Sequence, residues 1–141
     1  MQKAGYYRVC FSIDVGTHAA QLYVRKPVKL ERMRALVKKA NSIGLWTYAT
    51  FVIGFPNETF EDIHQTVAYA YSLRLDGVIF YIAQPHLGSE LYDVYLKESL
   101  IDERTAGVIQ SHHSPAESLF GTKHVSAAEL EALRNSAARG Y

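Results

Sequence analysis

The sequence predicts an α/β fold built on three parallel strands with flanking helices. Three apolar segments, residues 8–15, 45–53 and 77–83, begin about 30 to 40 residues apart, and helical patterns separate them. Strand–helix–strand units of this kind cross over in a right-handed sense, which makes the strands parallel. The second and third segments each break at a turn that contains Pro and Gly. Because functional residues of parallel sheets gather at the carboxyl ends of the strands, these two turns are the first candidates for a site.

Composition and periodicity predict the first strand, the first helix and the second strand. Residues 8–15 are rich in β-branched and aromatic side chains and end at Gly16, as strands do. In residues 28–43, apolar side chains recur at steps of three and four, which indicates one buried face of a helix. Gly44 is expected to end this helix in the left-handed conformation. Residues 45–53 form a nearly continuous apolar run, typical of a strand covered on both faces.

Capping residues mark the later helices. Thr59 is expected to cap a second helix, with Asp62 completing an acidic capping box. A third helix is predicted over residues 89–100, and a capping box of Ser126 and Glu129 starts the last one. The side chains expected to form the buried stripe of the second helix are Phe60, Ile63, Val67, Ala70 and Leu73.

This pattern divides the chain into three parts. Residues 1–101 carry the α/β unit, residues 102–125 form a polar, irregular loop, and residues 126–141 form a C-terminal helix. Helices on one side of the sheet leave the other side bare, and a bare apolar face favours association. We therefore expect the chain to self-associate, or else to cover this face with its C-terminal segment. The residues expected on the bare face are Val9, Phe11 and Ile13, or their neighbours.

Composition excludes several classes of function. The chain has 141 residues, of which 48% are hydrophobic and 21% charged, so a core can form. A net charge of +1 provides no basic field for nucleic acid. The single cysteine, Cys10, excludes a disulfide framework and any iron–sulfur or multi-cysteine zinc site that this chain would build alone. Without a run of 18 apolar residues or a signal-peptide core, we expect a cytoplasmic protein that does not enter membranes.

Two motifs carry a family resemblance. FVIGFPNET at residues 51–59 opens an amphipathic helix, and QPHLGSELY follows at residues 84–92. Together they resemble the later half of radical S-adenosylmethionine (SAM) enzymes, especially the cobalamin-associated branch that includes the magnesium-protoporphyrin cyclases. The similarity covers residues 3–101, and the closing ELEALRNSAARGY also resembles the end of that domain. The resemblance implies the later part of a (β/α)6 partial TIM barrel, beginning at about its fourth strand.

The resemblance also shows what this chain lacks. The family holds a [4Fe–4S] cluster with three cysteines in a CxxxCxxC loop, whereas this chain has only Cys10. The resemblance therefore implies a fragment of an Fe–S oxidoreductase that contributes the SAM-binding half and is inactive alone. The parent enzyme would use SAM and the [4Fe–4S] cluster to form a radical that abstracts hydrogen, with cobalamin as a further candidate cofactor. The implied partner is the missing N-terminal half of the barrel.

The family resemblance assigns polar contacts to the end of the first strand. Asp14 stands where the family has Glu, so its carboxylate would bind the ribose hydroxyls or the ammonium of SAM. Arg25 and Lys26 match a basic position that the family uses near the SAM carboxylate, a cation facing an anion. Two plainer interpretations stay open. Asp14 would then serve turn amides, and the basic pair would be a solvated charge before a helix.

The resemblance assigns the adenine contacts to the two proline-bearing turns. Gly54, Phe55 and Pro56 match the exit of the fifth barrel strand, where Gly permits close approach of the backbone. The exit of the sixth strand, which offers backbone groups to the adenine edge, is matched by Ile82, Ala83 and Pro85. The first of these segments is alternatively a simple turn, and Glu58 serves either a ligand or the helix dipole.

Histidine patterns do not predict a metal site. His112 and His113 are adjacent and have no third ligand at a suitable spacing, whereas His86 is the histidine placed to face a substrate.

Two other functions stay open. One is a non-catalytic interaction or assembly module derived from the same fold. The other is a TIM-barrel piece that performs hydrolysis or isomerisation, which Asp14 disfavours as the only charged group at a strand end.

Overall fold

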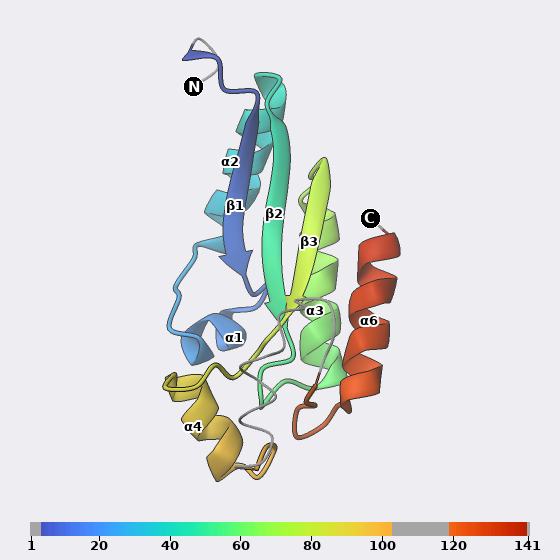
Figure 1. Cartoon of the computed structure of the whole chain (residues 1–141). Helices are drawn as coiled ribbons and strands as arrows, with labels where there is room; N and C mark the ends of the chain where they lie inside the picture. Colours follow the sequence, from blue (N-terminus) through green and yellow to red (C-terminus); the bar gives the residue numbers. More distant parts are fainter. Residues whose placement is uncertain (1–3, 103–118, 141) are drawn as a thin grey trace.

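A single three-stranded parallel sheet forms the centre of the molecule (Figure 1). The computed structural model describes residues 4–102 and 119–140. The strands are β1 (Arg8–Asp14), β2 (Trp46–Ile53) and β3 (Gly77–Ile82), in the spatial order β1-β2-β3. Both pairs are parallel, which confirms the predicted sheet. Within the described ranges the sheet does not close into a barrel.

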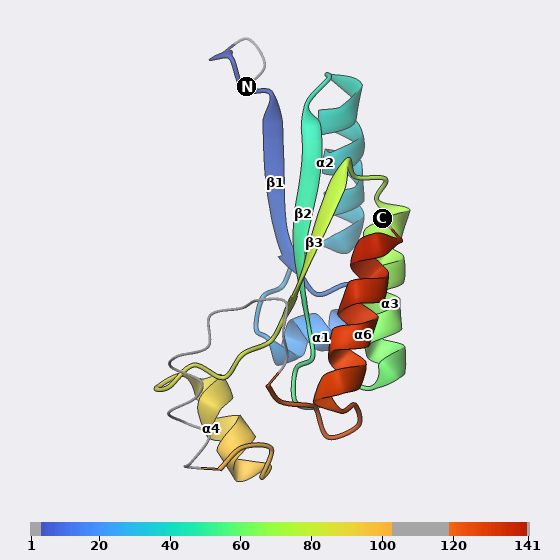
Figure 2. The ribbon, with the colours of Figure 1, turned by 45° about the vertical axis from the view of Figure 1, so that its right-hand side comes forward.

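The helices occupy two places around the sheet. Helices α2 (Leu30–Ser42), α3 (Phe60–Ser72) and α6 (Ala127–Arg139) lie on one face (Figure 2). Helices α1 (His18–Tyr23) and α4 (Glu90–Lys97) lie beyond the carboxyl ends of the strands (Figure 1). The crossovers therefore cover one side of the sheet, and the two shorter helices border the strand ends.

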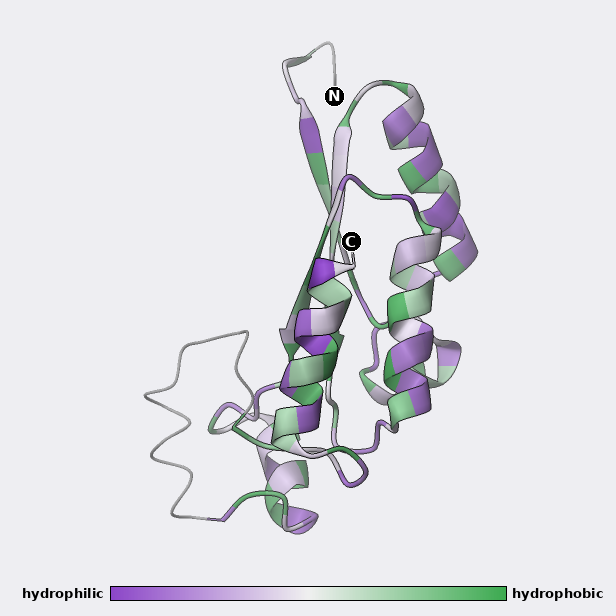
Figure 3. Cartoon of the chain, turned by 90° about the vertical axis from the view of Figure 1, so that its right-hand side faces the viewer, coloured by the Kyte–Doolittle hydropathy of each residue, from purple (hydrophilic) through white to green (hydrophobic). Residues whose placement is uncertain are grey.

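The core lies between the sheet and the helices α2, α3 and α6. Strand residues alternate between buried and more exposed positions, as expected for one covered face. Hydrophobic and hydrophilic residues likewise alternate around the helices, which are amphipathic (Figure 3). The fully buried strand side chains include Ile13, Phe51 and Phe80, and Leu130 of α6 joins them in the same core cluster.

The predicted helix starts and ends agree with the backbone geometry. The Thr59 hydroxyl accepts from Asp62 N, while the Asp62 carboxylate accepts from Thr59 N, which completes the capping box. Gly44 has φ of 75°, the left-handed conformation expected beyond α2. Phe60 was predicted in the buried stripe, but 40% of it is exposed. It is the first residue of α3, and the buried face of this helix begins only at Ile63.

Helix α1 was not predicted. It has only six residues, too few to show a periodic pattern. Its local signal is Thr17, whose hydroxyl accepts from Ala20 N at 3.1 Å as an N-cap. Good helix formers, Ala19, Ala20 and Leu22, follow this cap. This helix positions residues that border the strand ends.

The face of the sheet opposite the helices carries no described helix (Figure 2). The prediction that β2 is covered on both faces is therefore wrong for the described residues, and Trp46 of β2 is 46% exposed. Helix α6 packs on the same side as α2 and α3, so the C-terminal helix does not cover this face. Ile13 is buried and Val9 and Phe11 are half-buried, whereas the exposed residues of β1 are Arg8, Cys10 and Ser12.

Some expectations fall outside the described residues. Most of the predicted loop, including His112 and His113, lies in residues 103–118, and the division of the chain into three parts stays a prediction. The predicted last helix is confirmed as α6, with its Ser126–Glu129 capping box. None of the helices in the described ranges has the length and apolarity needed to span a membrane.

Candidate functional site at the strand carboxyl ends

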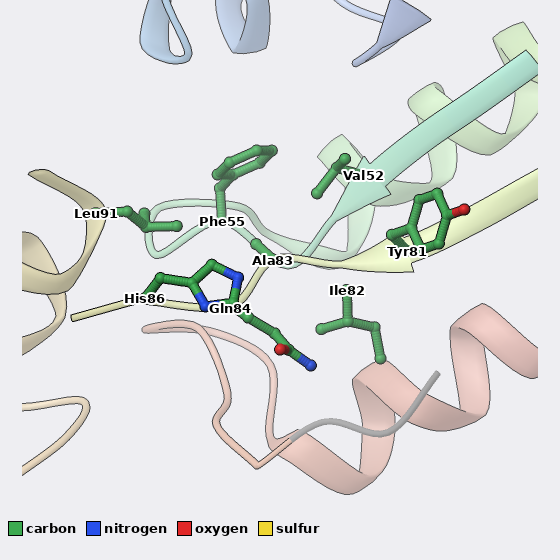
Figure 4. A pocket seen from close by; sticks show the side chains of 8 residues that line it. All are labelled: Val52, Phe55, Tyr81, Ile82, Ala83, Gln84, His86 and Leu91. Carbon is green, nitrogen blue, oxygen red and sulfur yellow. The ribbon is translucent and has the colours of Figure 1, made fainter. Parts of the chain in front are cut away.

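A cavity of about 330 Å³ lies at the carboxyl ends of β2 and β3 (Figure 4). Its walls are largely apolar, and three side chains, Tyr81, Gln84 and His86, carry hydrogen-bonding groups. The volume lies at the lower end of the range typical of ligand pockets. The lining residues are Val52, Phe55, Tyr81, Ile82, Ala83, Gln84, His86 and Leu91.

Three residues assigned by resemblance to adenine contacts line this cavity. Phe55 comes from the β2 exit, and Ala83 lies at the centre of the lining residues (Figure 4). The Ile82 side chain lies toward α6 and belongs to the core, with 4% of the residue exposed. The Ala83 N–H donates to Ile53 O at 2.8 Å, so this amide is already engaged within the sheet. Pro85 has no N–H and does not line the cavity.

The β2-exit turn is held from inside by Glu58. Gly54 has φ of 86°, a conformation that glycine adopts without steric cost. The Gly54 and Phe55 amides donate to Glu58 Oε2 at 2.6 and 2.9 Å. Glu58 is only 2% exposed. The sequence suggested that Glu58 serves a ligand or the helix dipole. In the structure its carboxylate instead fixes the turn that presents Phe55.

Burial makes the Glu58 carboxyl a weaker acid than usual. It raises the pKa of the carboxyl from its ordinary 4.5 to about 7, although the amide hydrogen bonds from Phe55 and Gly54 lower it. The nearby charge of Asp62 contributes a further rise in this pKa. Glu58 Oε1 is buried and has no hydrogen-bond partner within the described part of the chain. The desolvated oxygen explains why the proton is held so tightly.

Distant segments hold the same turn from outside. The Tyr95 hydroxyl of α4 donates to Gly54 O at 3.1 Å. Thr122 Oγ1 donates to Glu58 O at 2.9 Å, and Lys123 N donates to Pro56 O at 3.0 Å. Pro56 thus contributes its carbonyl to this support, and it does not line the cavity. The segment that follows β2 is therefore fixed by contacts that no local sequence pattern shows.

Asp14 and Lys26 form an ion pair at the end of β1. Lys26 Nζ lies 2.6 Å from Asp14 Oδ2 and also donates to Ser12 Oγ at 3.1 Å. The β1–β2 register shifts between Ser12 and Asp14, and Asp14 has φ of 68°. Such an irregularity re-aims a side chain at a strand end. Asp14 and Lys26, two of the three residues assigned to the polar groups of SAM, therefore contact each other, and the third, Arg25, contacts Glu90. All three lie outside the lining of the cavity.

The described residues do not fit an iron–sulfur cluster. Cys10 is exposed on β1, and a [4Fe–4S] cluster needs several thiolates. No group of three or more His, Cys, Asp or Glu side chains gathers at metal-binding distance within residues 4–102 and 119–140. What this edge of the sheet offers is a binding surface with apolar walls and an ion pair nearby.

Two curated proteins resemble this chain over most of its length. It is 30% identical over 109 residues to cytidylyl-2-hydroxyethylphosphonate methyltransferase of Streptomyces wedmorensis, which covers 72% of this chain and 20% of the relative. It is also 30% identical over 101 residues to an uncharacterized methyltransferase of Pyrococcus horikoshii, covering 72% and 22%. The chain is homologous to methyltransferases. It spans about a fifth of the length of these two relatives. No family model matches the chain.

Proposed function

We propose that this chain contributes the SAM-binding wall of a radical SAM methyltransferase. The observation that carries the proposal is the cavity at the exits of β2 and β3. Phe55, Ile82 and Ala83, which the family resemblance assigns to adenine, line it together. Similarity to two methyltransferases supports the same class of reaction.

The cavity suits the adenosyl group chemically. Phe55 and Leu91 offer apolar surface against which a purine ring packs. The side chains of His86 and Gln84 provide groups that hydrogen-bond to a heterocycle edge. Asp14 and Lys26 lie at the end of β1 in the same sheet, and their charges match a ribose or ammonium and a carboxylate, respectively. Binding of the complete cofactor would then require the Asp14–Lys26 pair to open.

The proposed role of this chain is binding and not electron transfer. Cys10 alone cannot hold the cluster, so the cluster ligands would belong to another part of a longer protein. In that arrangement the N-terminal strands of a (β/α)6 partial barrel would pair with the β1 edge. Cobalamin is retained as a candidate cofactor through the family resemblance.

A gain-of-activity experiment tests this function. The chain is joined to a cluster-bearing half-barrel, reconstituted with iron anaerobically and assayed for 5′-deoxyadenosine from SAM. Ala83→Phe fills the cavity and should abolish the product. Leu87→Phe, at a residue that is 56% exposed, is the matched control and should retain it. Equal activity in the two correctly folded variants would contradict a role for this cavity.

An assembly module is the second candidate function. The observation that favours it is the sheet face without a described helix, where Trp46 and Ile79 are 46% and 37% exposed. Arg134 Nε donates to Phe80 O at 3.0 Å, so α6 already occupies part of the β3 edge. Association would then use the β1 edge and the bare face. Light scattering across a concentration series should show oligomers, and a monomer at every concentration would contradict this function.

A further inference from the structure

A second cavity, of about 460 Å³, lies between α1 and α4. It shares Phe55 and Leu91 with the cavity at the strand ends, so these two side chains separate the two spaces. Its volume falls within the usual range for small-molecule sites. The other lining residues are Leu22, Tyr23, Val24, Arg25, Glu90 and Val94. Of the residues assigned to SAM by the resemblance, Phe55 and Arg25 line this space.

The walls of this second cavity are apolar and partly aromatic. The rings of Tyr23 and Phe55 pack edge to face, with centroids 6.1 Å apart and planes at 66°. Leu22 is 64% exposed although it belongs to a helix that borders the cavity. An aromatic pair beside exposed aliphatic surface favours a ligand with a flat apolar body.

The rim of the cavity carries one bidentate ion pair. Arg25 donates from Nη1 and Nη2 to the two carboxylate oxygens of Glu90, at 3.0 and 2.7 Å. The two side chains are 75% and 69% exposed, and such solvated pairs are weak. A competing anion can therefore take the place of Glu90 on the guanidinium, whose fork matches carboxylate, sulfonate and phosphate groups.

The bidentate fork of Arg25 favours an anionic ligand over a cationic one. Glu90 is the first residue of α4, where the N-terminal end of the helix stabilises a negative charge. Glu90 therefore keeps a favourable environment when Arg25 leaves it. Arg25 follows the C-terminal end of α1, where a helix favours a cation. An incoming anion gains two parallel hydrogen bonds from the guanidinium, whereas an incoming ammonium at Glu90 is bound only as a point charge.

We propose that the cavity between α1 and α4 binds a small amphipathic anion. The apolar body of the ligand packs on Tyr23, Phe55 and Val94, and its anionic group binds Arg25 in place of Glu90. This site shares Phe55 and Arg25 with the residues assigned to SAM, but its test needs no SAM and does not depend on the first cavity. If both sites are filled, the two ligands lie on opposite sides of Phe55 and Leu91.

Two fluorescent probes of similar size test the site. Anilinonaphthalene sulfonate carries an anionic group, and N-phenyl-1-naphthylamine is neutral. Arg25→Gln should weaken binding of the sulfonate about two- to fivefold, the range expected for losing one exposed charge contact, and leave the neutral probe unchanged. Glu90→Gln removes the competing carboxylate, so it should strengthen sulfonate binding and leave the neutral probe unchanged.

A matched pair on α4 distinguishes the cavity from other apolar surfaces. Val94→Phe fills the cavity and should weaken both probes, whereas Lys97→Phe adds the same side chain at an exposed position and should weaken neither. Circular dichroism and urea midpoints verify that each variant is folded. Unchanged binding in Val94→Phe would overturn the site. Equal effects of Arg25→Gln on the two probes would overturn the choice of an anion.

Discussion

The buried Glu58 carboxyl group binds the backbone of the turn that presents Phe55. One carboxylate oxygen accepts both amides of the turn, and the other has no partner in the described part of the chain. The sequence placed Glu58 in the first motif but left its role open, because burial depends on segments far along the chain. Thr122, which donates to Glu58 O, is 64 residues away. Local patterns do not carry that information.

The first residue-scale prediction concerns pH and stability. The folded chain holds the Glu58 proton with a pKa of about 7, above the ordinary 4.5 expected after unfolding. The stability that this group contributes is therefore complete below pH 4.5 and is lost as the pH rises through 7. The loss should be on the order of 1–3 kcal/mol. Urea unfolding at pH 5 and pH 8 measures it.

Two glutamine substitutions provide the comparison for Glu58. Glu58→Gln should flatten the decrease in the free energy of unfolding between pH 5 and pH 8. Glu61→Gln, at an exposed residue in the first turn of α3, should leave it as in the wild type. The same pH dependence in wild type and Glu58→Gln would show that another group is responsible.

A second residue-scale prediction concerns the β2-exit glycine. Gly54 and Gly88 both have positive φ, 86° and 81°, so alanine at either should cost about 1–2 kcal/mol of stability. A Cβ at Gly54 would also lie 3.0 Å from Leu130 Cδ1, whereas one at Gly88 meets nothing within 4 Å. Gly54→Ala should therefore cost about 1–3 kcal/mol more than Gly88→Ala. Equal unfolding free energies for the two variants would contradict the close packing at Gly54.

The resemblance located residues better than it located their partners. Phe55 and Ala83 came from turns that the sequence displays directly, and both line the cavity. Asp14 and Lys26 were assigned to a ligand, yet in the structure they contact each other. A shift in strand register and a left-handed residue bring them together, and neither feature is visible in the amino-acid pattern.

At the scale of elements, helix caps were the most reliable signals. Thr59 and Ser126 each begin a helix with a complete capping box. Helix α1 was missed because a helix of six residues has no full amphipathic period. The packing side of α6 was also left open by its sequence. Leu130 identifies it, since this side chain is fully buried in the core beside β2 and β3.

The element-scale prediction tests that packing. Leu130→Ala should destabilise the fold by about 2–5 kcal/mol, because it leaves a cavity in the core. Leu133→Ala, at a half-buried position on the same helix, should cost clearly less. Urea unfolding of both variants measures the difference. A loss for Leu133→Ala that equals or exceeds the loss for Leu130→Ala would mean that α6 packs through another face.

For the whole molecule, the three parallel strands and the bare side of the sheet were predicted, whereas the expected covering of β2 on both faces was wrong. The spacing of strand and helix patterns fixes connection and direction, which predicted parallel strands. Their order, β1-β2-β3, comes from the structure. Coverage of β2 depends on which other segments meet the sheet, and the described helices cover one face only. The aligned part covers about a fifth of the length of the two relatives. In the proposed parent enzyme, strands outside this chain would close the barrel.

The most direct measurement is a titration of the ¹⁵N-labelled chain with S-adenosylhomocysteine, followed by amide chemical shifts. This method detects weak binding, as expected for one wall of a site. We expect saturable shifts at Gly54, Phe55, Ala83 and Gln84, with Gly44 at the opposite end of β2 unchanged. Absence of shifts at millimolar ligand, or shifts confined to residues away from the β2 and β3 exits, would contradict it.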